Sequence, residues 1–170
     1  MLRIVTDGAA DLPKEWLDEY QIHVIPLMIR FGDEVFLQGV TIDEPGFYRQ
    51  VAEKHIIPKT SLPAPGQIVE FFRSVAQPGD TILSIHVSKK LSGTLDTVLL
   101  AASELKDEFD VYPFDSASGS LAMGFMCREA RRMDRAGANI QQILARLEEM
   151  RADQTVIFTM DNLDFAHMNG

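Results

Sequence analysis

The stretch Thr81–Thr97, TILSIHVSKKLSGTLDT, constrains the fold more than any other part of the sequence. Its first part, Thr81–Val87, is mostly apolar and contains no glycine or proline, which predicts a buried strand. A polar turn follows at 88–94, and apolar residues then recur with helical spacing at Leu95, Val98, Leu99 and Ala102. A strand, a polar turn and a helix in this order are typical of α/β proteins with a parallel sheet.

The same turn has the chemistry of an anion site. The first N–H groups of a helix lack partners within the helix, and the helix dipole places partial positive charge there. Gly93 would let the backbone approach a ligand closely, and the hydroxyls of Ser92 and Thr94 add donors. The alternative is that Ser92 only caps the helix, as serine often does at this position.

The rest of the chain repeats the alternation of strands and helices. The predicted strands are Leu2–Thr6, Ile22–Ile25, Leu27–Phe31, Val35–Leu37, Phe109–Phe114 and Thr155–Thr159. Helices are predicted after Pro13, Asp43, Gly66, Ser120 and Asn139, and the proline-rich residues 58–66 predict a constrained loop. We therefore expect one α/β domain over residues 1–170, with a mainly parallel sheet flanked by helices.

Composition narrows the classes of function. The net charge is −9 and no block of Lys or Arg is present, so we expect no nucleic-acid partner. The one cysteine, Cys127, excludes an internal disulfide and fits a cytoplasmic protein. No apolar run approaches the ~18 residues of a membrane span, so no stable membrane insertion is expected.

Catalytic and metal chemistry find little support in the sequence. It contains neither a G-x-S-x-G elbow nor a phosphate-binding G-x-x-x-x-G-K-[ST] loop. A triad of Ser92, His86 and Asp115 is conceivable, but a histidine on an apolar strand is more often a packed core residue. The four histidines are scattered and Cys127 has no partner at metal-ligand spacing, so we expect no metal site and no cofactor.

In parallel sheets ligands bind beyond the carboxyl ends of the strands, and four polar turns lie there in the sequence. They are Asp7–Asp11, Thr60–Ser61, Ser88–Thr94 and Asp115–Ser120. The side chains of Asp115, Ser116 and Ser118 in the last turn are supporting candidates for a ligand site.

These turns also carry a resemblance to a known family. TDGAADLP at 6–13, KTSLPAPGQ at 59–67, LSIHVSKKLSGT at 83–94 and DSASGSLAMG at 115–124 resemble the DegV family of bacterial lipid-binding proteins. The resemblance implies that a fatty acid binds with its carboxylate at the polar turns and its tail inside the protein. Carried over by position, Thr60, Ser61 and Ser92 would hold the carboxylate, and Gly93 and Thr94 would shape the turn.

The resemblance also implies a partner. Family members serve as the non-catalytic, acyl-binding subunit of a fatty-acid kinase and present the carboxylate to a separate subunit that uses ATP. Candidate residues for lining the tail are Phe31, Phe72, Met123 and Phe125. The competing hypothesis is an α/β domain of a phosphotransfer system that accepts a phosphoryl group on His23 or His86, although fold analogy is a weak warrant for function.

The sequence departs from the family pattern in two places. Gly8 and Ala9 stand where the family usually has hydroxyl residues, so we expect no direct ligand role for the first turn. Residues 160–170 resemble the segment that joins the family's two domains, and the chain stops there. The second domain, with its carboxylate-binding histidine, is therefore expected to be absent from this chain.

A pocket wall shaped for an acyl tail would be exposed without a second domain. We expect the chain as given to hide this wall by self-association, by swapping a terminal segment, or by loosening locally around Asp115–Met126. Soluble monomers seldom expose a contiguous apolar patch above a few hundred Å². Light scattering over a dilution series, with fatty-acid titration alongside, measures this. A monomer at high concentration with the full affinity of a two-domain relative would contradict the expected pocket.

Overall fold

The computed structural model describes residues 1–157 and 159. The contacts among them divide the chain into compact units. One consists of Met1–Ile25 together with Pro63–Thr155, and the other is built on Pro26–Leu62. We describe each unit by itself, and a single domain over residues 1–170 stays a prediction.

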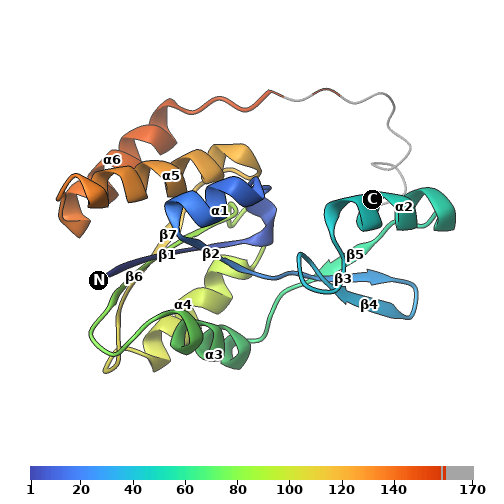
Figure 1. The fold of residues 1–170 in the computed structure, drawn as a ribbon, viewed down its shortest axis with the longest axis horizontal. Coiled ribbons are helices and arrows are strands. Elements are labelled where there is room, and N and C mark those ends of the chain that lie inside the picture. The colour runs from blue at the N-terminus through green and yellow to red at the C-terminus, as the bar shows by residue number, and fades with distance from the viewer. Residues whose placement is uncertain (158, 160–170) are drawn as a thin grey trace. The chain divides into compact units, whose positions relative to one another are not determined.

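The first unit is built on a parallel sheet with the strand order β2-β1-β6-β7 (Figure 1). Its strands are β1 (Leu2–Asp7), β2 (Ile22–Ile25), β6 (Thr81–His86) and β7 (Asp110–Asp115). Its helices are η1 (Gly8–Ala10, a 3₁₀ turn), α1 (Lys14–Tyr20), α3 (Pro65–Val75), α4 (Thr94–Glu104), α5 (Leu121–Arg135) and α6 (Ile140–Asp153). The predicted α/β class with a mainly parallel sheet is confirmed.

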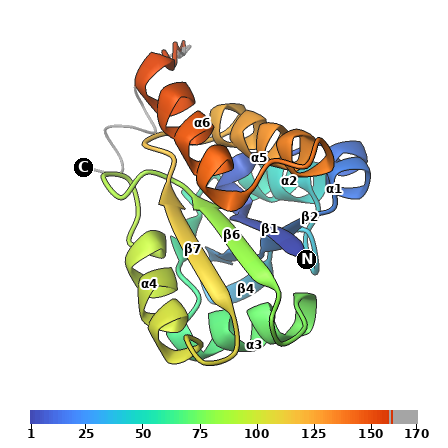
Figure 2. The same cartoon turned by 90° about the vertical axis from the view of Figure 1, so that its left-hand side faces the viewer.

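Helices cover both faces of this sheet, with α5 and α6 on one face and α3 and α4 on the other (Figure 2). Neighbouring residues of a strand point to opposite faces. Accordingly, Ile4 packs in the cluster with α5 and α6, whereas Val5 packs in the cluster with α3 and α4. Ile82 and Leu83 divide between the two clusters in the same way. The central strands are apolar on both faces because both faces are buried.

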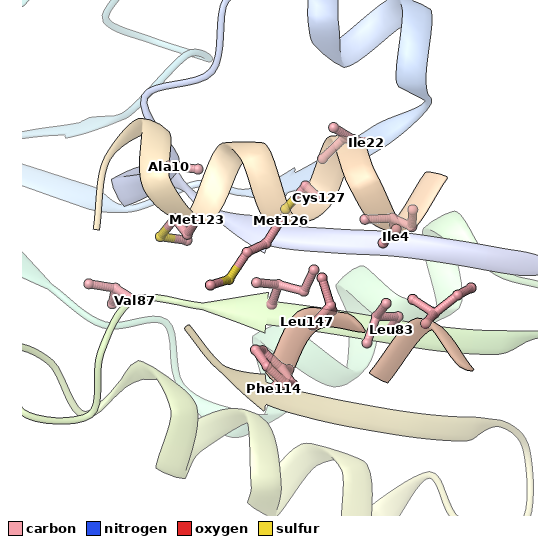
Figure 3. Close-up of a cluster of buried hydrophobic side chains, with 13 residues drawn as sticks. Ile4, Ala10, Ile22, Leu83, Val87, Phe114, Met123, Met126, Cys127 and Leu147 are labelled. Carbon is pink, nitrogen blue, oxygen red and sulfur yellow. The ribbon is translucent and has the colours of Figure 1, made fainter. Parts of the chain in front are cut away.

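The cluster beneath α5 is the larger of these two cores (Figure 3). Figure 3 shows the side chains of Met123 and Met126 pointing from α5 toward the strands. Arg131 on the same helix is only 5% exposed and donates to the carbonyl oxygens of Leu2, Tyr20 and Gln21. Apolar packing and these carbonyl contacts together fix α5 against β1.

The second unit contains an antiparallel sheet of order β4-β3-β5 and one helix. Its elements are β3 (Met28–Phe31), β4 (Glu34–Leu37), α2 (Glu44–Lys54) and β5 (Lys59–Ser61). Gly32 has a φ of 62°, which suits the tight turn between β3 and β4. Ile29, Phe31 and Ile42 form the core of this unit.

Two predictions from local patterns were wrong. Lys59–Ser61 forms an edge strand inside the predicted loop, because Pro58 and Pro63 bracket these residues without interrupting the pairing with β3. Residues 155–157 and 159 form no strand, although their sequence is β-branched. The predicted inter-domain segment at 160–170 lies outside the described residues.

Phe72 and Phe125, which the sequence analysis names as candidates for lining the acyl tail, differ in their burial. Phe72 on α3 is fully buried, whereas Phe125 on α5 is 42% exposed. We expect Phe72→Ala to lower the free energy of unfolding by about 3–5 kcal/mol, because it leaves a core cavity. Phe125→Ala loses mainly an edge contact with Trp16 and should cost about 0.5–1.5 kcal/mol. Urea denaturation measures both variants, and an equal loss would contradict the assigned packing.

Candidate functional site

Three of the predicted polar turns meet at one edge of the parallel sheet, since β1, β6 and β7 are neighbours and end there. Backbone hydrogen bonds join the turns directly. The N–H of Ser88 donates to the carbonyl of Ser118 (2.8 Å), and that of Ser120 donates to the carbonyl of Ala9 (2.7 Å). The N–H of Ser116 donates to the carbonyl of His86 (3.1 Å). The three turns therefore form one connected backbone network.

The turn before α4 uses the hydroxyl of Ser92. Its Oγ accepts a hydrogen bond from the N–H of Thr94 (3.3 Å) and lies 2.9 Å from the Thr94 hydroxyl. Gly93 occupies the cap position of α4 and makes no side-chain cap. Thr94 is buried, Ser92 is half-buried and Gly93 is exposed. Ser92 thus contributes to the start of the helix, while its exposed part still faces solvent.

The first turn of α4 has unpaired donors. Among the described residues, the N–H groups of Leu95 and Asp96 have no hydrogen-bond acceptor. Such groups carry the positive end of the helix dipole and suit an anionic ligand. The exposed carboxylate of Asp96 lies in the same first turn and also interacts favourably with the positive end of the helix dipole.

The turn after β7, at residues 115–120, is stabilised by hydrogen bonds among its own residues. Oδ1 of Asp115 accepts from the N–H of Ala117 (2.9 Å) and, at 3.4 Å, from that of Lys89. Ser116 Oγ accepts from the N–H of Ser118 (3.1 Å) and donates to its carbonyl (3.2 Å). Both serines are buried. The polar groups of Asp115, Ser116 and Ser118 therefore stabilise the turn, and a direct ligand contact from them stays a prediction.

Backbone strain is concentrated in this turn. Ala117 and Ser120 have φ angles of 52°, in the left-handed region that few residues other than glycine adopt. Strained positions of this kind cost about 1–3 kcal/mol each and persist only where the surrounding contacts hold them. The hydrogen bonds to Ala9 and Ser88 provide such contacts.

The other predicted carboxylate ligands, Thr60 and Ser61, lie in the second unit. They pair with Ile29 and Met28 across β3 and β5, and both are exposed. Their approach to Ser92 stays a prediction. A hollow of about 440 Å³ also lies in the second unit, with Asp43 and Arg49 in its lining, and it includes none of the predicted site residues.

One polar cluster was missed by the sequence analysis. Nδ1 of His86 lies 2.8 Å from Oδ2 of Asp7, and Nε2 of His86 lies 2.6 Å from Oγ of Ser84. All three residues are fully buried. The signal was present, because Ser84 and His86 alternate with apolar residues and so share one face of the strand.

This arrangement excludes the triad considered from the sequence. His86 hydrogen-bonds to Asp7 and Ser84, and among the described residues no hydrogen bond joins its ring to Ser92 or Asp115. Burial raises the pKa of the Cys127 thiol to about 12, so this cysteine is a poor nucleophile. Within residues 1–157 and 159, no three His, Cys, Asp or Glu side chains gather in a way that could hold a metal ion.

None of the helices in the described part of the chain is both long enough and apolar enough to cross a bilayer.

Comparisons with known proteins agree with the observed architecture. A family model described as uncharacterised proteins of the DegV family matches residues 1–170. Protein DegV of Bacillus subtilis (strain 168) is 36% identical over 168 residues, which cover 98% of this chain and 59% of that relative. The chain thus spans little more than half the length of this relative.

Two solved structures show the same fold. A DegV family protein from Thermus thermophilus, described by its fatty-acid binding, has a TM-score of 0.86 at 30% identity, covering 98% of this chain and 59% of its own. DegV from Bacillus subtilis, described as a fatty acid binding protein, has a TM-score of 0.82 at 35% identity, covering 89% of this chain and 54% of its own. Sequence, fold and the three connected turns lead to the same conclusion: this chain belongs to the DegV family.

Proposed function

We propose that this chain binds a long-chain fatty acid, with the carboxylate at the start of α4. The observation that carries this proposal is the turn Ser92–Thr94, where unpaired helix N–H groups and a half-buried hydroxyl stand at the edge of a parallel sheet. Similarity to proteins described as fatty-acid binding supports the same ligand class. Binding of the carboxylate by Thr60 and Ser61 stays a prediction.

The tail and the carboxylate of a fatty acid would contribute very different free energies of binding. Each buried methylene contributes about 0.8 kcal/mol, so a long acyl chain gains roughly 10 kcal/mol before the costs of association and ordering. A carboxylate at a helix N-terminus adds about 0.3–2 kcal/mol. The tail therefore supplies most of the affinity, and the turn fixes which end of the ligand faces solvent.

The proposed tail-lining residues differ in how accessible they are. Phe72 and Met123 are fully buried in the two cores of the first unit, and Phe31 is buried in the second unit. Phe125 is 42% exposed and packs against Trp16. A tail that reached Phe72 or Met123 would have to displace core neighbours, so Phe125 is the most accessible of the three tail-lining candidates in the first unit.

In the proposed function the chain has no catalytic role. It holds the fatty acid and presents the carboxylate to a separate kinase subunit, which transfers a phosphoryl group from ATP and forms an acyl-phosphate. We place this activity in the bacterial cytoplasm, where ATP and the kinase are available. Self-association of the chain as given stays a prediction.

The competing phosphotransfer function is not favoured by the geometry. Both ring nitrogens of His86 are engaged by buried partners, so neither can attack a phosphoryl donor. His23 is half-buried, and its pKa is lowered mainly by burial and further by Arg3 and Arg131. The sequence also contains no phosphate-binding G-x-x-x-x-G-K-[ST] loop.

We expect a fatty acid to co-purify with the protein from bacterial cells without added ligand. The test is denaturing extraction and mass spectrometry, run in parallel on this chain and on Protein DegV of Bacillus subtilis. A fatty acid on both proteins supports the proposal for this chain. Phosphohistidine in place of a lipid would support the phosphotransfer function, and background lipid on both proteins would refute fatty-acid binding.

Substitution of Ser92 tests whether its hydroxyl contacts the ligand or only caps the helix. If it binds the carboxylate, Ser92→Ala should weaken fatty-acid binding by about 1–3 kcal/mol. If it only caps α4, the variant should lose about 1 kcal/mol of stability with unchanged affinity. Ser103→Ala, an exposed position near the other end of α4, is the matched control. Fatty-acid titration and urea denaturation on each variant separate the two roles.

A further inference from the structure

The buried cluster of Asp7, His86 and Ser84 has no part in the proposed function so far. All three side chains are 0% exposed, on the face of the sheet that α3 and α4 cover. Burying a carboxylate is costly unless hydrogen bonds compensate for the lost water. Such a cluster therefore persists because its own contacts satisfy it.

Asp7 receives its hydrogen bonds from two separate segments. Oδ1 accepts from the N–H of Ala9 (2.9 Å), which lies in the turn after β1. Oδ2 accepts from the N–H of Val87 (3.1 Å) and faces Nδ1 of His86 (2.8 Å), both at the end of β6. One carboxylate thus fastens the first turn to the segment that leads into the Ser88–Thr94 turn.

The ring of His86 is oriented by the same contacts. An ionised carboxylate only accepts hydrogen bonds, so the nitrogen that faces Asp7 carries a hydrogen. In the neutral ring, Nε2 then accepts from the hydroxyl of Ser84, 2.6 Å away. The Ser84 hydroxyl therefore satisfies Nε2, while Nδ1 donates to the carboxylate of Asp7.

From Val87 a continuous series of hydrogen bonds reaches the candidate site. Ser88 follows Val87 directly, and its carbonyl accepts from the N–H groups of Leu91 (2.8 Å) and Ser92 (3.1 Å). The hydroxyl of Ser92 then accepts from the N–H of Thr94, the first residue of α4. Each step joins residues that are adjacent in the chain or directly bonded.

We propose that Asp7 and His86 are positioning residues for the Ser88–Thr94 turn. Their contacts fix the end of β6, and through it the Ser92 hydroxyl and the unpaired N–H groups at the start of α4. The consequence for ligand affinity rests on the proposed fatty-acid function, whereas the consequence for the turn does not. Ser84, His86 and Asp7 share the connectivity of a hydrolytic triad, but a fully buried Ser84 cannot meet a substrate.

Two substitutions of His86 provide a matched pair. The side-chain amide of asparagine ends near the position of Nδ1, so His86→Asn keeps a donor toward Asp7. The longer amide of glutamine ends near Nε2, so His86→Gln keeps an acceptor toward Ser84 and loses the contact with Asp7. Ser84→Ala is the control, because it removes the far contact and leaves the Asp7 pair in place.

The first measurement is amide hydrogen exchange at Leu91, Ser92 and Thr94, with the amides in the centre of β6 as an internal reference. We expect His86→Gln to speed exchange in the turn by about tenfold relative to β6, the equivalent of one lost hydrogen bond to a charged group. His86→Asn and Ser84→Ala should stay within about twofold of the unmodified protein. Equal effects of Asn and Gln, or equal losses in the turn and β6, would overturn the proposal.

The second measurement is fatty-acid titration of the same variants. His86→Gln should bind about tenfold more weakly, and the other two variants should bind as the unmodified protein does. Unchanged affinity in His86→Gln would refute the positioning of the ligand site. If the unmodified protein binds no fatty acid but the turn exchanges as expected, the proposed function fails and the positioning role stands.

A third measurement does not depend on the folding of any variant. The ¹⁵N shifts of the His86 ring in the unmodified protein should show a hydrogen on Nδ1. A ring with its only hydrogen on Nε2 would overturn the proposed contact with Asp7. If His86→Gln fails to fold, the ¹⁵N shifts of the His86 ring and amide exchange in Ser84→Ala test the proposal. Faster exchange of the Ser88–Thr94 turn in Ser84→Ala would also contradict it.

Discussion

The parallel pairing of β1 with β6 is the constraint on which the rest of the first unit depends. Ile4 lies opposite Leu83 and Thr6 opposite Ile85, so both strands are central and buried on both faces. Parallel neighbours end at the same edge, which brings the polar turns after β1, β6 and β7 together. Burial of the strands thus provides both the core and the geometry of the candidate site.

The polar contacts at this edge are of two kinds, those within one turn and those that join two turns. Ser116 and Ser118 bond within their own turn, and Asp115 bonds to its own turn and to Lys89. Asp7 joins two turns through a buried carboxylate, which a low-dielectric surrounding makes both strong and costly to break. Among the described residues, the N–H groups of Leu95 and Asp96 in the first turn of α4 have no acceptor. The polar groups that shape the turns are hydrogen-bonded to one another, whereas these N–H donors are available to a ligand. Such a site is preorganised for an anion, because the donors need not rearrange to bind it.

Much of this architecture could be predicted from local patterns. The helix at 121–135 and the start of the next one at Asn139 follow from apolar spacing and a capping residue, and the Asn139 side chain does accept from the Gln142 N–H. Lys59–Ser61 was missed because a three-residue edge strand has too little pattern of its own. Its partner β3 lies about thirty positions earlier, and only pairing with that strand makes it a strand.

The sequence by itself determined most of the order of elements, the chemistry of each turn and the family, because these depend on neighbouring residues. Only the tertiary structure decided which turns meet and which polar groups are used within them. Asp7 and His86 are 79 positions apart, and no local pattern pairs them. The same holds for Phe72 and Phe125, which are alike in sequence but buried and exposed in the fold. Long-range pairing of strands, and the packing of helices on them, decides both outcomes.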